Sequence, residues 1–178
     1  EIVTDTNIKP QKAFNPYNSV KAVCDIATEV LGEGNPSIRV KLDGTLGACN
    51  GIEEDYCSAV AAMLAFAIKH CAAGVVWVDG TLTDRKYRLS VSFKSDISVQ
   101  ELEEEQTAHL KADLLYIRCI AENGLWGFSV DKTASGEARL NFSVPLYAME
   151  VMPLMQPAVY ESLRAVVKTQ LVFLRKKG

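Results

Sequence analysis

The sequence predicts a single α/β (α+β) domain, because segments with helical spacing of apolar residues are interspersed with short runs typical of strands. Two stretches carry most of this prediction. Residues 53–78 indicate a long amphipathic helix, a short turn and a buried strand, and residues 110–144 indicate a helix followed by two strands. At 178 residues, 48% of them hydrophobic, the chain is long enough to build one real core.

Composition excludes several classes of protein. The net charge of −3 argues against a nucleic-acid binder that works by neutralising phosphates. No apolar run reaches the roughly 18 residues that a membrane span needs, and no signal peptide is recognisable. The first residue is Glu1, which suggests an excised domain or a processed product, and we expect a cytoplasmic location.

The cysteines are odd in number and form no Cys-x-x-Cys pair, so we expect buried free thiols in a reducing compartment. They are Cys24, Cys49, Cys57, Cys71 and Cys119. No metal site is expected, because only His70 and His109 could join them and the spacings fit no common zinc pattern.

The first elements follow a polar, proline-containing lead-in over residues 1–17. Apolar residues at helical spacing predict a helix over residues 20–31, for which Asn18 or Ser19 is a suitable N-cap. Alternation over residues 38–42 then predicts a half-buried strand.

The central helix is expected after a loop at residues 43–51. Asn50 and Glu53 fit a capping box at its start, and Gly74 is expected in the left-handed conformation that closes its end. A strand over residues 75–82 follows. The apolar stripe of the helix consists of Tyr56, Val60, Met63, Leu64, Ala67, Ile68 and Cys71.

A hairpin comes next, with its turn at Asp84 and Arg85 and its second strand alternating through residues 89–93. Residues 97–108 are acidic, and we expect them to be solvated, with a short helix capped by Ser98.

The remaining elements are a helix, two strands and a final helix. Strands are expected over residues 125–130 and 139–144, and Pro157 is suited to open the last helix. The stripe of the first helix is Leu110, Leu114, Ile117 and Ala121. The stripe of the last helix is Tyr160, Leu163, Val167, Leu171 and Leu174.

The segment AIKHCAAGVV resembles a helix of the histidine-kinase ATPase superfamily, the fold shared with gyrase and MutL. There the helix reads Asn-Leu-Leu-x-Asn-Ala-Ile-Lys-Phe-Thr and is followed by a glycine and a strand. Ala67, Ile68, Lys69 and Gly74 fall on matching positions.

Pro145 and Leu146 fall on the Pro-Leu pair that ends the family domain. The resemblance covers roughly residues 14–146. It implies a two-layer sandwich, a mixed β-sheet with helices packed on one face. It divides the chain into the lead-in at residues 1–17, a degenerate ATPase-like domain at 18–146 and a C-terminal helical extension at 147–178.

The positions that bind nucleotide in this family carry other residues here. Ala62 and Phe66 stand in place of the two asparagines, the second of which coordinates the Mg²⁺ that bridges the ATP phosphates. Phe66 has no ligand atom. The family's Asp-x-Gly, whose Asp binds the adenine amino group, corresponds to Phe93, Lys94 and Ser95. We expect Phe66 and Phe93 to fill the volume in which adenine and metal would sit.

The lid of the family domain is also altered. Its glycines let backbone amides cradle the phosphates, but no glycine occurs between Gly80 and Gly124. Four carboxylates that would repel a triphosphate stand there instead: Glu101, Glu103, Glu104 and Glu105.

These replacements predict a histidine-kinase-like pseudokinase module of two-component phosphorelay signalling, similar to the ATPase-like domain of bacterial histidine phosphotransferases. We expect no catalytic residues and no cofactor, and neither a nucleic-acid nor a membrane partner. Its partner would be a kinase, a receiver domain or a second copy of itself. The alternative is a nucleotide-binding ATPase or kinase with a divergent active site. The degenerate pocket would comprise Ala62, Phe66, Lys69, Phe93 and Ser95.

The last helix leaves two alternatives open, because the family fold is already complete at Leu146. Its apolar stripe is either covered by its own domain or pairs with another copy or a partner helix. The candidate partner-binding residues are Tyr160, Leu163, Val167 and Leu171.

Overall fold

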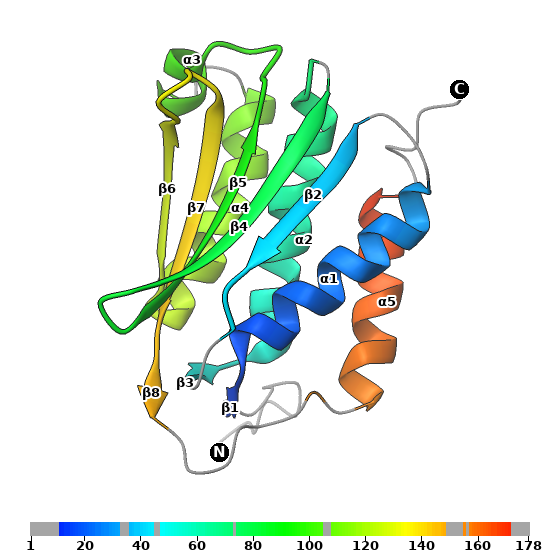
Figure 1. The fold of residues 1–178 in the computed structure, drawn as a ribbon, viewed down its shortest axis with the longest axis vertical. Coiled ribbons are helices and arrows are strands. Elements are labelled where there is room, and N and C mark those ends of the chain that lie inside the picture. Colours follow the sequence, from blue (N-terminus) through cyan, green and yellow to red (C-terminus); the bar gives the residue numbers. More distant parts are fainter. Residues whose placement is uncertain are drawn as a thin grey trace, which may run out of the picture.

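The computed structural model describes residues 11–32, 36–44, 47–72, 74–104, 108–148, 155 and 157–171. The chain forms a two-layer sandwich in which a five-stranded sheet is covered by helices on one face (Figure 1). The first two strands in the order pair in parallel and the others antiparallel, so the sheet is mixed, as predicted. The strands, in spatial order, are β2 (Ser37–Leu42), β4 (Val75–Thr83), β5 (Lys86–Phe93), β7 (Ala138–Pro145) and β6 (Gly127–Lys132).

The helical layer is built around the predicted central helix, which contacts α1, α4, α5 and strand β5. In Figure 1, α2 and α4 lie behind the sheet, and α1 and α5 lie beyond its β2 edge. The helices are α1 (Pro16–Leu31), α2 (Glu53–His70), α3 (Val99–Glu104), α4 (Ala108–Gly124) and α5 (Pro157–Leu171). None of these is long and apolar enough to cross a membrane.

The core lies between the two layers, where the predicted apolar stripes of α2 and α4 meet the inward positions of the strands. All residues of both stripes are buried. Each large apolar side chain buried in this way stabilises the fold by about 1.5–3 kcal/mol relative to leaving it exposed. The inward positions of β5, the second strand of the central hairpin, are Tyr87, Leu89, Val91 and Phe93, all fully buried.

A second, three-stranded sheet was not predicted. It orders β1 (Lys12–Phe14), β3 (Gly47–Gly51) and β8 (Tyr147–Ala148), all antiparallel. The expectation of a loop at residues 43–51 is therefore wrong for β3. Its sequence, GACNG, lacks the alternation of a half-buried strand, and it becomes a strand through pairing with segments distant in the sequence.

The caps predicted for α1 and α2 are wrong. Helix α1 starts at Pro16, and the cap is Asn15, whose Oδ1 accepts a hydrogen bond of 3.0 Å from the N–H of Tyr17. Asn18 and Ser19 lie inside the helix because proline is well suited to the first helical position.

The residue before α2 is Ile52, which makes no capping hydrogen bond, and Asn50 belongs to β3. The carboxylate of Glu53 instead accepts a hydrogen bond of 2.9 Å from the Ser19 hydroxyl. At the other end, α2 stops at His70, whereas Gly74 has the expected positive φ of 91° four residues later.

Helix α5 packs against α1 and α2. Leu163, Val167 and Leu171 are buried, and Tyr160 is partly buried against the same core. The chain itself therefore covers the stripe, which is the first of the two alternatives, and these three buried side chains offer no exposed partner surface. Leu174 lies outside the described residues.

The cysteines are free, and Cys24, Cys49, Cys57 and Cys71 are buried as expected. Cys119 is exposed, so the expectation of burial is wrong there. It lies on α4 between the buried positions Ile117 and Ala121, where the helix turns its side chains away from the sheet.

Candidate functional site

The C-terminal half of α2 carries three of the predicted pocket residues on one helix face. Ala62, Phe66 and Lys69 are spaced by four and three residues, which brings them into line. They line a groove of about 340 Å³ between α2 and α4, together with Ala65, Ala112, Asp113, Tyr116 and Gln170. The structure therefore brings these three residues together, and the helix α4 forms the opposite wall.

Phe66 points its ring toward the end of β5. Only 3% of its surface is exposed, and the centroids of its ring and that of Phe93 lie 6.3 Å apart in an edge-to-face arrangement. The centroid of the His70 ring lies 4.6 Å from the centroid of the Phe66 ring. Aromatic side chains therefore fill the space between the end of α2 and the end of β5, and the rings of Phe66 and Phe93 have no atom that can ligate a metal. Among the described residues, no group of three or more His, Cys, Asp or Glu side chains is placed to hold a metal ion.

The segment after β5 is attached to the end of α2 through its backbone. The Ala72 N–H donates to the Lys94 carbonyl over 2.7 Å, and the Asp96 N–H donates to the His70 carbonyl over 2.9 Å. The Nδ1 of His70 lies 3.3 Å from a carboxylate oxygen of Asp96. Backbone groups of Lys94 and Asp96 thus hold the end of β5 and the end of α2 together.

Ser95, the fifth predicted pocket residue, is not among the residues that line the groove. It forms an isolated bridge with Cys71, and its hydroxyl accepts a 3.0 Å hydrogen bond from the Ile97 N–H. Its side chain therefore serves a local turn.

Lys69 forms an ion pair with Asp113 across the groove, with 3.5 Å between Nζ and Oδ2. Both side chains are nearly half exposed, so the pair contributes little to stability. It does matter for ligand binding, because an anion that approached Lys69 would have to compete with the carboxylate of Asp113.

The acidic segment contains the short helix expected there. The Ser98 hydroxyl accepts a 3.2 Å hydrogen bond from the Glu101 N–H, as a cap does. Leu102 was missed as a core residue, although it is fully buried and α3 contacts β6. Leu102 lies five residues after the partly buried Ile97, a spacing that fits neither a helix face nor a strand face, so the sequence carries no periodic signal for the burial of Leu102.

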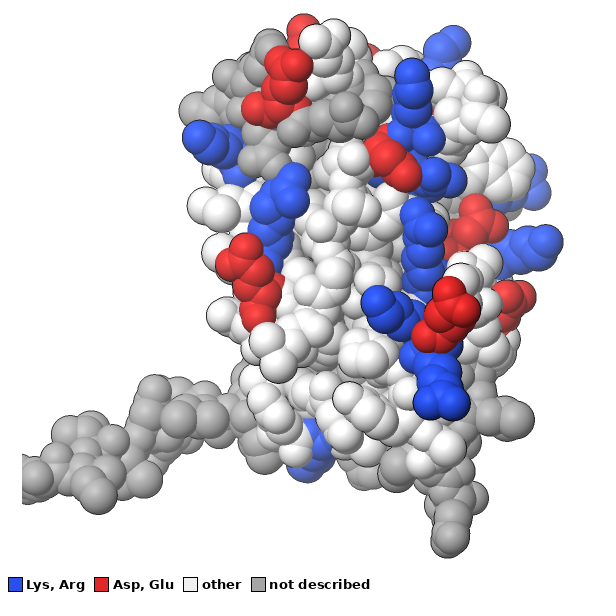
Figure 2. Space-filling model, turned by 90° about the vertical axis from the view of Figure 1, so that its left-hand side faces the viewer, with Lys and Arg blue, Asp and Glu red and all other residues white. Residues whose placement is uncertain are grey.

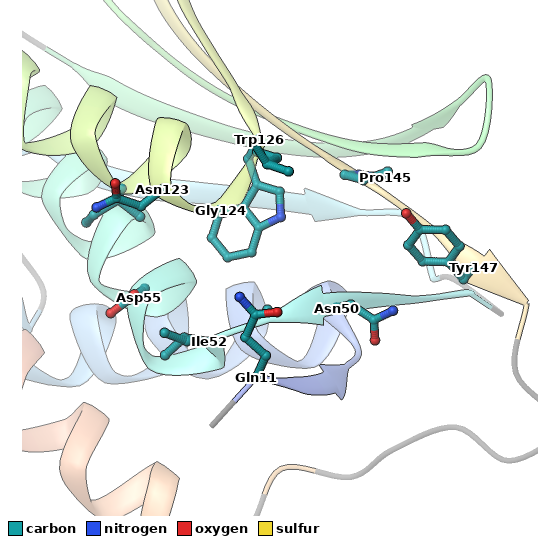
Figure 3. Close-up of a pocket in the computed structure, with 12 residues that line it drawn as sticks. Gln11, Asn50, Ile52, Asp55, Asn123, Gly124, Trp126, Pro145 and Tyr147 are labelled. Carbon is teal, nitrogen blue, oxygen red and sulfur yellow. The ribbon is translucent and has the colours of Figure 1, made fainter. Parts of the chain in front are cut away.

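A second cavity, of about 260 Å³, lies near the small sheet and was not found from sequence (Figure 3). Asn50, Asn123, Trp126 and Tyr147 line it. Trp126 packs so closely on Gly51 and Gly124 that a Cβ on either glycine would clash with the indole. Beneath it, burial raises the pKa of the Cys49 thiol to about 12, which makes this thiol a poor nucleophile.

Comparison with known proteins agrees with the fold. No protein-family model matches the sequence, and a search of the curated proteins gives no match. Solved structures do match. The mycobacterial sensor histidine kinase MprB has a TM-score of 0.63 and 14% identity, covering 79% of this chain and 100% of that chain.

The catalytic domain of histidine kinase ThkA has a TM-score of 0.65 and 15% identity, covering 77% of this chain and 98% of that one. The cytoplasmic segment of histidine kinase QseC has a TM-score of 0.56 and 15% identity, covering 82% and 85%. These structures share with this chain the mixed sheet and the helical layer described above, and the chain has the histidine-kinase ATPase-like fold.

Proposed function

We propose that this chain is a non-catalytic, histidine-kinase-like signalling module that has lost ATP binding and acts by binding a protein. The observation that carries the proposal is Phe66, which stands where the family has its metal-coordinating asparagine. Its ring is buried against Phe93 and His70. Phe93 stands in turn where the family has the aspartate that binds adenine.

The expected loss of ATP affinity follows from the two replaced residues, one of which would contact the metal and the other adenine. Charge-assisted hydrogen bonds contribute about 1.5–3 kcal/mol each. Losing two of them would take a micromolar dissociation constant into the millimolar range. The pairing of Lys69 with Asp113 acts in the same direction, because it neutralises a positive charge beside the groove.

Calorimetric titration with a non-hydrolysable ATP analogue and Mg²⁺ tests the proposal. We expect no saturable binding below about 100 μM, a limit that corresponds to roughly −5.5 kcal/mol. A histidine kinase catalytic domain titrated in parallel shows that the analogue and the metal are competent. Saturable binding below that limit would rule out the loss of ATP binding.

The alternative is a nucleotide-binding domain with a divergent site, and the open groove beside Lys69 favours it. Two exposed side chains distinguish the alternatives. If nucleotide phosphates used Lys69, Lys69→Gln would weaken binding, and Asp113→Asn would strengthen it by freeing the lysine. If neither variant changes the titration, the groove does not bind the nucleotide.

The partner in our proposal is a kinase, a receiver domain or a second copy of this chain in the cytoplasm. Similarity to histidine kinase domains supports this class of partner. Sedimentation equilibrium over about 1–100 μM tests for the second copy, since standard interfaces bind in or below this range. A strictly monomeric chain would leave the kinase and receiver domains, each of which can be titrated separately.

A further inference from the structure

The face of the main sheet that carries no described helix points toward the viewer in Figure 1. Side chains alternate along strands, so positions 86, 88, 90 and 92 of β5 lie on this face and positions 87, 89, 91 and 93 in the core. In the view turned by 90°, Lys and Arg side chains line the right-hand side, where this face lies, with Asp and Glu side chains between some of them (Figure 2). These basic side chains contrast with the net charge of the whole chain, which is −3.

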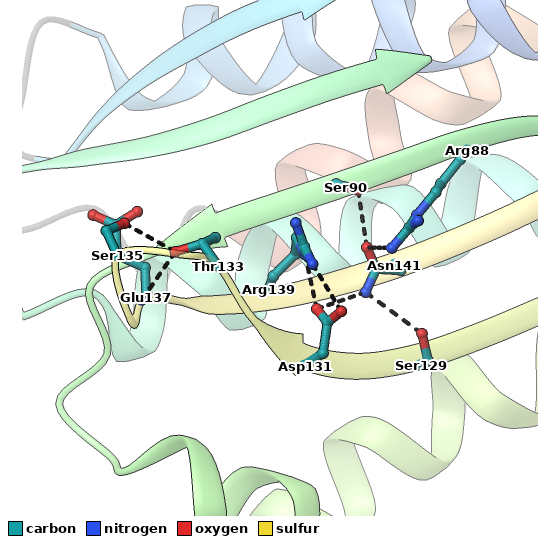
Figure 4. A network of polar contacts seen from close by, with 9 residues as sticks. All are labelled: Arg88, Ser90, Ser129, Asp131, Thr133, Ser135, Glu137, Arg139 and Asn141. Atoms are coloured by element: carbon teal, nitrogen blue, oxygen red, sulfur yellow. Dashed lines mark hydrogen bonds and ion pairs between the residues drawn. The ribbon is translucent and has the colours of Figure 1, made fainter. Parts of the chain in front are cut away.

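A polar network holds the middle of this face in place (Figure 4). Asn141 is only 4% exposed. Its Oδ1 accepts hydrogen bonds of 2.9 Å from both Arg88 and Ser90. Its Nδ2 donates to Asp131 over 2.9 Å and to the Ser129 hydroxyl over 3.4 Å. The guanidinium of Arg88 is therefore positioned by a buried partner that engages one of its five donors.

The second arginine of the network, Arg139, is already paired with a carboxylate and is therefore less able to bind a ligand. Arg139 makes two hydrogen bonds of 2.8 Å to the two carboxylate oxygens of Asp131. Its charge is neutralised by this fork-shaped pair. Arg88, by contrast, is hydrogen-bonded to a neutral amide and interacts with Asp131 only at longer range, so the network of two arginines and one carboxylate keeps one positive charge in excess.

Beside Arg88 the face is hollowed. The hollow, about 440 Å³, is lined by Lys86, Arg88, Gly127, Ser129 and Ser143, among others. Arg88 and Ser143 are register partners, as are Ser143 and Gly127, so the three stand in one row across β5, β7 and β6. The missing side chain of Gly127 creates the space, because a Cβ there would lie 2.7 Å from the Ser143 hydroxyl oxygen.

We propose that this hollow binds a phosphate monoester or inorganic phosphate. Two cations and two hydroxyl donors from three different strands line one space, which suits a tetrahedral group with several acceptor oxygens. The carboxylate of Asp84 also lines the hollow, so the local charge is one positive unit in excess. The ligand is free phosphate or a phosphorylated side chain of a partner protein, and both present the same oxygens.

The test is a titration of the full chain, followed in ¹H–¹⁵N correlation spectra at constant ionic strength. The probes are inorganic phosphate, a phosphoserine hexapeptide and the same peptide without phosphate. Phosphate should shift the amide signals of Arg88, Gly127, Ser129 and Ser143 saturably, with a dissociation constant on the order of 1 mM. Absence of saturation, or shifts confined to other regions, would overturn the proposal.

Variants locate the site. Arg88→Gln and Gly127→Ala should each weaken phosphate binding about tenfold, the second by filling the hollow and displacing the Ser143 hydroxyl. Lys86→Gln should weaken it about two- to fivefold. The exposed side chain of Lys86 makes unfolding of this variant no concern.

Lys41→Gln is the matched control, because Lys41 is an exposed lysine on β2, on the same face but two strands away from β5. It should leave binding unchanged. Equal weakening by Lys41→Gln and Lys86→Gln would show diffuse attraction to the face and overturn the site.

The peptides distinguish the two sources. Phosphopeptide binding at least tenfold tighter than inorganic phosphate assigns the site to a phosphorylated partner, and equal affinity assigns it to the free ion. Equal affinity for the phosphorylated and the unphosphorylated peptide would contradict the proposal, since binding would then not depend on the phosphate group.

Discussion

Phe66 is a large apolar side chain that is almost completely buried at the end of the central helix. Position 66 lies on the helix face directed toward β5, where the Phe66 ring packs against Phe93. An asparagine needs hydrogen-bond partners in this place, whereas a phenylalanine needs only apolar neighbours, which Phe93 and the His70 ring supply.

Phe66→Asn should therefore destabilise the protein by about 1–3 kcal/mol, because a polar amide is then buried without partners. Urea unfolding measures the change. Ala62→Asn is the matched control, since it places the same amide one turn earlier on the same face, where the side chain is only partly buried and can reach solvent. An unchanged stability for Phe66→Asn would show that the ring is not packed as described.

Asp131 gives a prediction of pH dependence. Hydrogen bonds from Arg139, and in addition from Asn141, hold the pKa of its carboxyl below the ordinary value, although partial burial opposes them. A carboxyl with a lowered pKa in the folded state stabilises the protein above its ordinary pKa, and this contribution is lost as the pH falls through the folded-state pKa. The effect is small, because 41% of the side chain is exposed.

Asp131→Asn should therefore be less stable than the natural sequence at pH 7, and the difference in unfolding free energy should shrink as the pH falls below the ordinary pKa of an aspartate. Urea unfolding at several pH values measures it. Asp84→Asn, in the exposed hairpin turn, is the control and should show a smaller difference at pH 7. A difference for Asp131→Asn that grows toward acid pH would contradict the assignment.

At the scale of elements, the sequence predicted a helix or strand correctly where an apolar stripe of that element faces the core. The helices α2 and α4 and the central hairpin were predicted because apolar periodicity reports burial directly. The turn at Asp84 and Arg85 was also predicted, and both residues have positive φ, as such hairpin turns require.

What could not be predicted depends on partners distant in sequence. The strand β3 has no periodicity and exists through its pairing with β1 and β8. The cap at Asn50 failed for the same reason, because its backbone pairs with Ala13 of β1. Of the pocket residues, Ala62, Phe66 and Lys69 shared a face by helical spacing, but the bridge that takes Ser95 to Cys71 follows only from the tertiary fold.

Helix α5 is an element whose role can be tested by removal. Three of its apolar side chains are buried against α1 and α2. At about 1.5–3 kcal/mol each, they contribute an amount comparable to the whole stability of a typical domain. Deleting residues 157–178 should therefore yield a protein that unfolds or aggregates, as seen by circular dichroism and gel filtration.

Single substitutions refine this test. Val167→Ala should destabilise the chain by about 2 kcal/mol, whereas Lys168→Ala, at the exposed neighbouring position, should be close to neutral. A deletion variant that remained folded but lost self-association would instead assign the helix to an interface.

At the scale of the molecule, the two faces of the main sheet have different characters. The helical face holds the apolar core and the packed rings of Phe66 and Phe93, whereas the other face carries Arg88 and the rest of the network around Asn141. The small sheet joins the start of the chain, the segment before α2 and the segment after β7. Elements from both ends of the sequence thus contribute to one core, to which α5 also belongs.

This shared core predicts a single cooperative unfolding transition that includes α5. The chain has two tryptophans. In a Trp77→Phe variant, which changes an exposed side chain, fluorescence reports only Trp126, packed with Phe14, Tyr56 and Phe142 near the small sheet. Circular dichroism reports all helices, including α5, which packs against α1 and α2. The two urea curves of this variant should share one midpoint. Loss of part of the helical signal at a lower urea concentration than the Trp126 signal would mean that α5 unfolds on its own.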